Sequence, residues 1–218
     1  MAYGDQIVAN PGGISAADGD MNPPTMGKAR EYLVASLHGE AYTQCYRGNV
    51  FIGAAAAAGI VPPIYSNTAQ TFMIWNPAGS GKLVVPISLN IGLVTVGVVT
   101  DNLVWAYFPN AGSQLGTAAP VSALTAANPV NAYIGHQNQS ITRFAPATAT
   151  VLAPSLLRPT GITNFMAASP TAENDFYTMR EELHGSIILG PGNALFLANN
   201  IAGVATYNVA VTWAEIPV

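Results

Sequence analysis

Few side chains in this sequence could bind a metal, and the three histidines are the best candidates. Histidine occurs three times, and His38 and His184 stand in the same local string, Leu-His-Gly. If the two strings faced each other across a sheet, Glu40 or Glu182 could complete a metal site, because imidazole and carboxylate groups are metal ligands. The spacings H-x-H and H-x-x-x-H are absent, however. We therefore interpret these residues and His136 as structural histidines.

Two further strings resemble binding loops but lack essential members. Asp18, Asp20 and Asn22 have the spacing of a calcium loop, yet Pro23 replaces the required glycine and no closing glutamate follows. Residues 76–82 end in Gly-Lys like a phosphate-binding loop, but its first glycine and its final serine or threonine are missing. The first string therefore predicts no metal site, and the second predicts a hairpin turn between two strands.

The remaining reactive side chains do not form a catalytic set. Cys45 is the single cysteine and stands in a strand-like run, so we expect a small buried hydrophobe. Glu181 and Glu182 are adjacent, so in a strand they would point to opposite faces. The chain also lacks a nucleophile elbow and a dinucleotide-binding fingerprint. We therefore assign no catalytic, cofactor-binding or metal-binding residue, and we expect a protein that is not an enzyme and needs no cofactor.

Charge is unusually sparse along the whole chain. Half of the residues are apolar and 8% are charged, against about 25% in an ordinary soluble protein. These charged side chains are too few to give a free monomer the charged surface of a typical soluble protein. We therefore expect contacts between copies of the chain to bury part of the surface. A monomer coated with serine, threonine and asparagine is the alternative.

The distribution of charge and hydrophobicity excludes two kinds of partner. The seven basic residues are scattered singly and the net charge is −4, so direct binding to nucleic acid is not expected. Residues 83–100 are apolar enough to suggest a membrane span, but they alternate with the period of a strand. No membrane contact is predicted. The first ten residues do not resemble a signal peptide, so we expect synthesis in a cytoplasm without export by the usual route.

The elements that would position these residues are predicted to be strands. The clearest pattern is at the C-terminus, where Tyr207, Val209, Val211 and Trp213 alternate with small or polar residues, as in a half-buried antiparallel strand. A Gly-Pro-Gly-Asn turn precedes it, so residues 186–218 predict a C-terminal hairpin. We therefore expect an all-β fold, an antiparallel β-sandwich at 28–218 with an extended N-terminal arm at 1–27.

The rest of the chain supplies further predicted elements. Residues 28–37 could be a short helix or a strand, residues 54–58 a loop or one helical turn, and residues 175–182 a solvated edge. The apolar face changes near Gly92, which predicts two strands within 83–100. The other predicted strands are 41–46, 49–53, 70–75 and 103–108, with short runs at 132–134, 140–144 and 150–152.

Several strings resemble those of small structural proteins of tailed bacteriophages. They are Leu-His-Gly-Glu at 37–40, Arg-Gly-Asn-Val-Phe at 47–51 and residues 76–82, and the segment 186–218 is similar to the closing hairpin of jelly-roll virion proteins. Such proteins are typically decoration or cement proteins, or head-fibre subunits, that trimerise on a capsid. The resemblance implies that the expected sandwich is jelly-roll-like and implies a role, but it transfers no binding residue.

The expected function is that of a capsid decoration or cement protein that stabilises the phage head through homo-oligomeric contacts, most simply as a trimer. Its expected partner is the major capsid protein or another virion protein, and its location is the virion, assembled in the host cytoplasm. One alternative is a tail or head-fibre adhesin that binds a host glycan with loops around Tyr65, Trp105 and Tyr133. Another is a cupin-like or sugar-active enzyme, because a fold does not fix a function.

Overall fold

The computed structural model describes residues 41–67, 69–95, 97, 101–108, 129–145, 149–150, 154–163 and 178–218. Ala41–Val218 belongs to one compact unit. The predictions for residues 1–40 lie outside the described residues. They are the N-terminal arm, the element at 28–37, the domain boundary at residue 28, the calcium-like string, His38 and Glu40.

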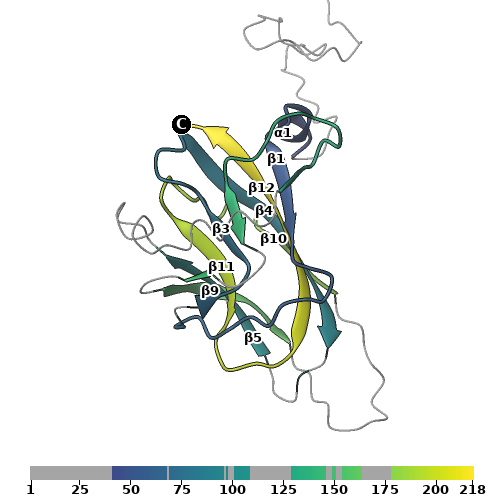
Figure 1. Ribbon diagram of the computed structural model, residues 1–218, viewed down its shortest axis with the longest axis vertical. Helices are drawn as coiled ribbons and strands as arrows, with labels where there is room; N and C mark the ends of the chain where they lie inside the picture. The colour runs from purple at the N-terminus through teal and green to yellow at the C-terminus, as the bar shows by residue number, and fades with distance from the viewer. Residues whose placement is uncertain are drawn as a thin grey trace, which may run out of the picture. The chain divides into compact units, whose positions relative to one another are not determined.

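The described chain forms an antiparallel β-sandwich of two five-stranded sheets (Figure 1). The order of the first sheet is β10 (Thr178–Glu182), β4 (Lys82–Thr95), β12 (Thr206–Pro217), β1 (Val50–Ala54) and β6 (Val130–Asn131). The order of the second sheet is β7 (Arg143–Ala145), β3 (Met73–Trp75), β11 (Ala194–Asn199), β5 (Asp101–Phe108) and β9 (Ser155–Thr163). A short helix, α1 (Tyr42–Tyr46), and a two-stranded pair, β2 (Ala69–Gln70) with β8 (Ala149–Thr150), complete the described elements.

The order of strand pairing identifies the sandwich as a jelly roll. The outermost pair along the chain is β1 with β12, and the pairs β3 with β11, β4 with β10 and β5 with β9 are nested inside it. The chain therefore folds as one long double ribbon. Wrapping the ribbon brings β12 beside β4 and β11 beside β5, which gives the Greek-key connections of a jelly roll. The predicted all-β, jelly-roll-like sandwich is confirmed.

The strand β12 is at the centre of the first sheet, as its alternation predicted. Tyr207, Val209, Val211 and Trp213 are buried, whereas Asn208 between them is exposed. The strand pairs with β4 along one side and with β1 along the other. A strand that pairs on both sides and buries every second side chain is a central strand with one face against the core.

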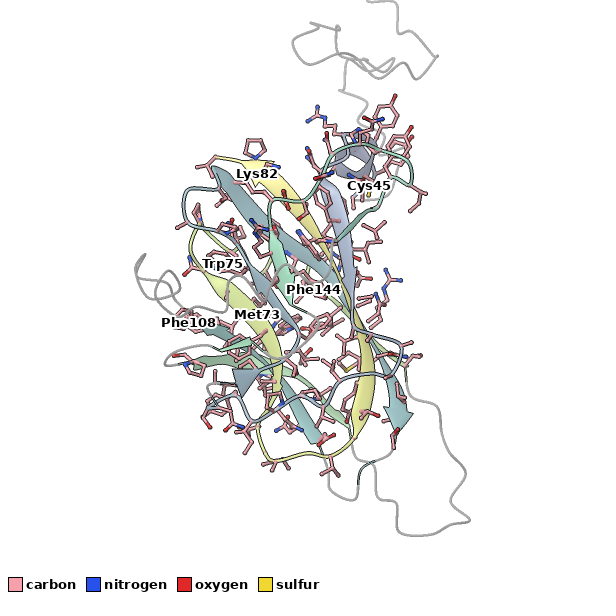
Figure 2. The ribbon with its side chains drawn as sticks, in the orientation of Figure 1. Cys45, Met73, Trp75, Lys82, Phe108 and Phe144 are labelled. Carbon is pink, nitrogen blue, oxygen red and sulfur yellow. The ribbon has the colours of Figure 1, made fainter. Side chains whose placement is uncertain are left out.

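Aromatic side chains fill the space between the two sheets. Trp213 has no exposed surface, and its ring centroid lies 6.4 Å from that of Phe51 and 6.2 Å from that of Phe144. Phe144 meets Phe72 edge to face at 5.2 Å, an arrangement that aromatic pairs favour. Figure 2 shows Phe144 in the middle of the sandwich. Because Phe144 comes from β7 of the second sheet and Trp213 from β12 of the first, this cluster joins the sheets.

The predicted C-terminal hairpin is wrong. The strands β11 and β12 are consecutive but belong to different sheets, so they do not pair with each other. Residues 187–189 contribute one isolated bridge, from Leu189 to Val84. The turn 76–82 likewise connects β3 of the second sheet to β4 of the first and is not a hairpin. Turn residues mark where a chain reverses, but they do not specify which sheet receives the next strand.

The predicted strand at 41–46 is instead the helix α1. Its backbone bonds run from the Cys45 N–H to the Ala41 carbonyl and from the Arg47 N–H to the Thr43 carbonyl. The helix buries no residue. Tyrosine and threonine are enriched in strands, so local preference predicted the wrong element here.

The apolar stretch after Lys82 is one strand through Thr95 and does not break at Gly92. Gly92 pairs directly with Asn208, and the irregularities in pairing occur on either side of it, near Ile87 and Val94. The buried face changes between Ser88 and Leu89. A bulge shifts the pleat by one residue, so the pattern changes face while the strand continues. The predicted second strand beyond residue 95 lies almost entirely outside the described residues.

Other predicted elements are confirmed with altered bounds. Residues 49–53 and 103–108 correspond to β1 and β5, and residues 54–58 close β1 and make a turn. The run 70–75 is interrupted at Phe72, whose φ of 52° ends β2 before β3 begins. The described part of 175–182 is the edge strand β10. The short runs at 140–144 and 150–152 overlap β7 and β8, whereas residues 132–134 follow β6 as a turn.

Candidate functional site

His136, His184 and Cys45, which lie in the described part of the chain, do not belong to a metal-binding group. His184 is exposed in a turn with a φ of 44°, and Glu182 forms an ion pair with Arg180. Cys45 lies in α1 (Figure 2) and is partly exposed, which corrects the prediction of a buried residue. Burial still raises the pKa of the Cys45 thiol, which favours the protonated, less reactive form. Among the described residues, no three His, Cys, Asp or Glu side chains are placed to hold a metal.

The three aromatic residues proposed for a glycan site do not come together. Trp105 has no exposed surface, and Tyr65 packs against the apolar cluster on the other face of the second sheet. Tyr133 is exposed over 45% of its surface. Of the three, therefore, only Tyr133 is available for a ligand stacking on an exposed ring.

The carboxylate of Glu181 accepts hydrogen bonds that join the two sheets at one side of the sandwich. The indole Nε1 of Trp105 donates to it at 2.8 Å, the guanidinium of Arg158 at 2.6 Å, and the hydroxyl of Thr160 also donates to it. Glu181 lies on β10 and Arg158 and Thr160 lie on β9, so the group connects edge strands of the two sheets. The strand β10 is therefore not simply a solvated edge.

Asp101 is a second carboxylate with an internal structural role. It has no exposed surface and accepts hydrogen bonds from the Tyr207 hydroxyl at 2.5 Å and the Asn199 side chain at 2.7 Å. Its partners come from both sheets. Gly203 approaches so closely that a Cβ there would overlap the side chains of Asp101 and Asn199. The cluster therefore fixes the loop between β11 and β12.

Glu215 is a third carboxylate, and it holds the loop between β6 and β7. It has no exposed surface. The hydroxyls of Ser140 and Thr142 donate to it at 2.5 and 2.8 Å, and the backbone N–H groups of Ile141 and Thr142 donate at 3.1 Å. Lys82 adds an ion pair at 3.0 Å. A buried carboxylate needs such partners to remain charged.

These contacts determine the charge state of Glu215. Burial by itself would raise its pKa, but hydrogen bonds from Ser140, Lys82 and Thr142 outweigh that effect and lower the pKa below its usual value. The carboxylate is therefore ionised at neutral pH. Its hydrogen bonds to residues 140–142 give the end of the β6–β7 loop a fixed position.

Asn131 holds the beginning of the same loop. Its side chain is 8% exposed and donates to the carbonyl of Gly48 at 2.8 Å and to that of Asn138 at 3.3 Å. Its carbonyl oxygen accepts the backbone N–H of Tyr133 at 2.9 Å. The Asn138 side chain donates to the carbonyl of Arg47. The loop is therefore joined to the turn between α1 and β1.

The anchored loop carries a row of polar side chains, which we call the amide loop and which comprises His136, Gln137, Asn138, Gln139 and Ser140. His136 packs over Gly48, whose missing side chain leaves room for the ring and whose φ of 70° also favours glycine. Its Nδ1 accepts the backbone N–H of Asn138 at 3.1 Å. Together with Pro129 and Asn131, the amide loop lines a pocket of about 490 Å³.

A row of near-parallel tyrosine rings adjoins the amide loop. We call Tyr42, Tyr46 and Tyr133 the tyrosine surface. The ring of Tyr46 lies 6.3 Å from those of both Tyr42 and Tyr133, with interplanar angles of 14° and 17°. Tyr133 also lies 5.3 Å from the ring of His136, so the two features are contiguous. The three tyrosines are 46%, 55% and 45% exposed.

Sequence reasoning identified one member of this region and missed the rest. Tyr42 and Tyr46 are four residues apart, which places them on one face of a helix, but residues 41–46 were expected to be a strand. The string Gln-Asn-Gln at 137–139 was visible as a polar run. Its proximity to the tyrosines depends on contacts across about ninety residues of chain, which no local pattern reports.

Comparison of the chain with protein-family models, with curated proteins and with solved structures finds no match. The described part of the chain contains no helix with the length and apolar character needed to cross a bilayer.

Proposed function

We propose that the chain is a non-enzymatic structural protein of a tailed-phage virion, a capsid decoration or cement protein that stabilises the head through homo-oligomeric contacts. The observation that carries this proposal is the contrast between a filled interior and a weakly charged surface. Its proposed partners are copies of itself, most simply in a trimer, and the major capsid protein or another virion protein. Its proposed location is the virion, assembled in the host cytoplasm.

The interior supports a structural role. The space between the sheets is occupied by large side chains that have almost no exposed surface, among them Trp105, Trp213 and Phe144. The buried carboxylates Asp101 and Glu215 accept hydrogen bonds from other parts of the fold. Such a core stabilises the molecule and leaves recognition to its surface. Jelly rolls serve in viral capsids, in lectins and in cupins, so the fold agrees with the proposal without deciding it.

The edge strand β9 supports contacts with another protein. Its exposed residues include Leu156 and Leu157, at 43% and 42%. Arg158, its one charged residue, is paired with Glu181. Pro159 and two irregularities in the pairing with β5 limit the addition of another strand to this edge, but exposed apolar side chains promote association. We infer that β9 contacts a second copy of the chain.

The oligomeric state of the purified chain tests this proposal. We expect light scattering to show a homo-oligomer over a wide range of concentration, and we expect Leu156→Asp to dissociate it. Ile188→Asp is the matched control, because Ile188 is also exposed, at 57%, but lies outside β9. Co-sedimentation with phage heads that lack the protein then tests the capsid partner. A monomer at every concentration, with no binding to heads, would refute the proposal.

A further inference from the structure

The amide loop is held at both ends by hydrogen bonds to buried polar side chains. Buried Asn131 fixes its start and buried Glu215 fixes its end. A polar group buried without partners is costly, so any other loop conformation that breaks these bonds is disfavoured. The loop is therefore preorganised, and preorganised loops on a rigid scaffold are common positions for binding residues.

The side chains that this loop presents are neutral and can both donate and accept hydrogen bonds. Gln137, Asn138 and Gln139 are exposed, and each carries an amide with donor and acceptor groups. The Nδ1 of His136 is an acceptor toward the loop backbone, so in the neutral imidazole Nε2 carries the hydrogen and can donate. Residues 129–142 contain no charged residue. This chemistry matches a ligand rich in hydroxyl groups.

The tyrosine surface adds flat apolar area beside these polar groups. Its rings are close to half exposed and almost parallel, and Tyr133 lies 5.3 Å from His136, which lines the pocket. Exposed aromatic surface therefore adjoins the polar groups. The face of an aromatic ring has a negative electrostatic potential and attracts the weakly positive C–H groups of a ligand. Sugars combine such C–H faces with hydroxyl edges. The pocket of about 490 Å³ lies within the size range of small-ligand sites.

We propose that the tyrosine surface and the amide loop form a binding site for a neutral saccharide. The sugar face packs against the exposed ring surface of Tyr133, while its hydroxyl groups exchange hydrogen bonds with Gln137, Gln139 and His136. This function does not depend on the proposed role in the capsid. It would equip a structural protein to bind a glycan on a cell surface.

The test uses the full chain and a panel of neutral oligosaccharides built from glucose, galactose, mannose and N-acetylglucosamine, with sialylated and sulfated counterparts. Saturation-transfer NMR detects binding, and titration calorimetry measures affinity. We expect at least one neutral member to bind, with saturation strongest on its ring C–H protons. We expect Tyr133→Ala to weaken binding by about tenfold or more, as loss of an aromatic anchor does.

Two further variants keep the test decisive. Because Tyr46 and Tyr133 also pack between α1 and the loop, Tyr133→Ala could disturb the fold, so Gln137→Ala tests the site through an exposed amide. Asn200→Ala is its control, an exposed amide in the loop between β11 and β12, at the other end of the sandwich from α1 (Figure 1). We expect Gln137→Ala to weaken binding and Asn200→Ala to leave it unchanged.

Several outcomes would overturn the proposal. They are no binding by any neutral member at millimolar concentration, binding by the acidic members alone, which would indicate recognition by charge, and equal affinity of Gln137→Ala, Tyr133→Ala and the unaltered chain. Light scattering on the same samples reports assembly separately. A failure of saccharide binding can therefore be distinguished from a failure of the proposed structural role.

Discussion

The Nζ of Lys82 lies 3.0 Å from Oε2 of Glu215, a carboxylate that has no exposed surface. Lys82 begins β4 and Glu215 lies near the end of β12, two strands that pair along the centre of the first sheet. The same carboxylate accepts hydrogen bonds from residues 140–142. One ionised group thus connects the end of the chain, the longest strand pair and the loop that carries the candidate site.

Stability should depend on the ionisation of Glu215. Because its pKa in the folded protein lies below the ordinary value of 4.5, the stabilisation is fully present above that value and is lost as the pH falls through the folded-state pKa. We expect Glu215→Gln to lower the free energy of unfolding at pH 7 by about 3 kcal/mol and to flatten the acid limb of the profile. Urea titrations from neutral to acidic pH measure both effects.

Glu182→Gln is the control for that experiment, because Glu182 is more exposed and its surface ion pair with Arg180 is worth at most about 1 kcal/mol. If the two variants gave the same pH profile, Glu215 would not be the group responsible.

Removing the aromatic side chain at the centre of the core should be costly. Trp213 has no exposed surface and contacts aromatic rings from both sheets. We expect Trp213→Ala to reduce the free energy of unfolding by about 3–5 kcal/mol, because it removes apolar burial and leaves a cavity. Thr212→Ala, at a partly exposed neighbouring position of β12, should change it by less than about 0.5 kcal/mol. A loss below about 1 kcal/mol for Trp213→Ala would contradict this account of the core.

The hydroxyl of Tyr207 should contribute to stability through Asp101. Tyr207→Phe keeps the ring but removes the donor that lies 2.5 Å from the buried carboxylate. We expect a loss of about 1.5–3 kcal/mol, the range for a hydrogen bond to a charged group, measured by urea denaturation at pH 7. Tyr133→Phe removes a hydroxyl from an exposed tyrosine and should be close to neutral. Equal effects of the two changes would show that the Asp101 contact adds nothing.

The close approach of Asp101 to Gly203 should exclude residues with a side chain at position 203. A Cβ added to Gly203 would overlap the side chains of Asp101 and Asn199, so we expect Gly203→Ala to destabilise the fold by about 1–3 kcal/mol. At Gly190 the nearest neighbour of an added Cβ is 3.6 Å away, an ordinary contact. Gly190→Ala should therefore be tolerated. Thermal unfolding of the two variants checks the comparison, and an unchanged Gly203→Ala protein would mean that the loop can shift freely.

Local patterns determined the class of the fold. The alternation from Tyr207 to Trp213 identified a half-buried strand, because side chains on a strand point alternately to its two faces. The apolar run at 103–108 also predicted a strand, and the structure shows that this strand, β5, is buried on both faces. The helix α1 was missed because its tyrosines and threonine favour a strand, whereas in the folded chain the two tyrosines share one helix face.

Tertiary structure decided which strands pair and which side chains meet. The nested pairing of β1 with β12 joins residues about 160 positions apart, and no turn signal specifies such a partner. Glu215 appears in the sequence as a charged residue near the chain end, yet it is buried because Ser140 and Thr142 supply its hydrogen bonds. Tyr133 meets Tyr46 through the same long-range packing. The sequence by itself determined the all-β class through periodicity, a local property, whereas the candidate site depends on contacts that exist only after the ribbon has wrapped.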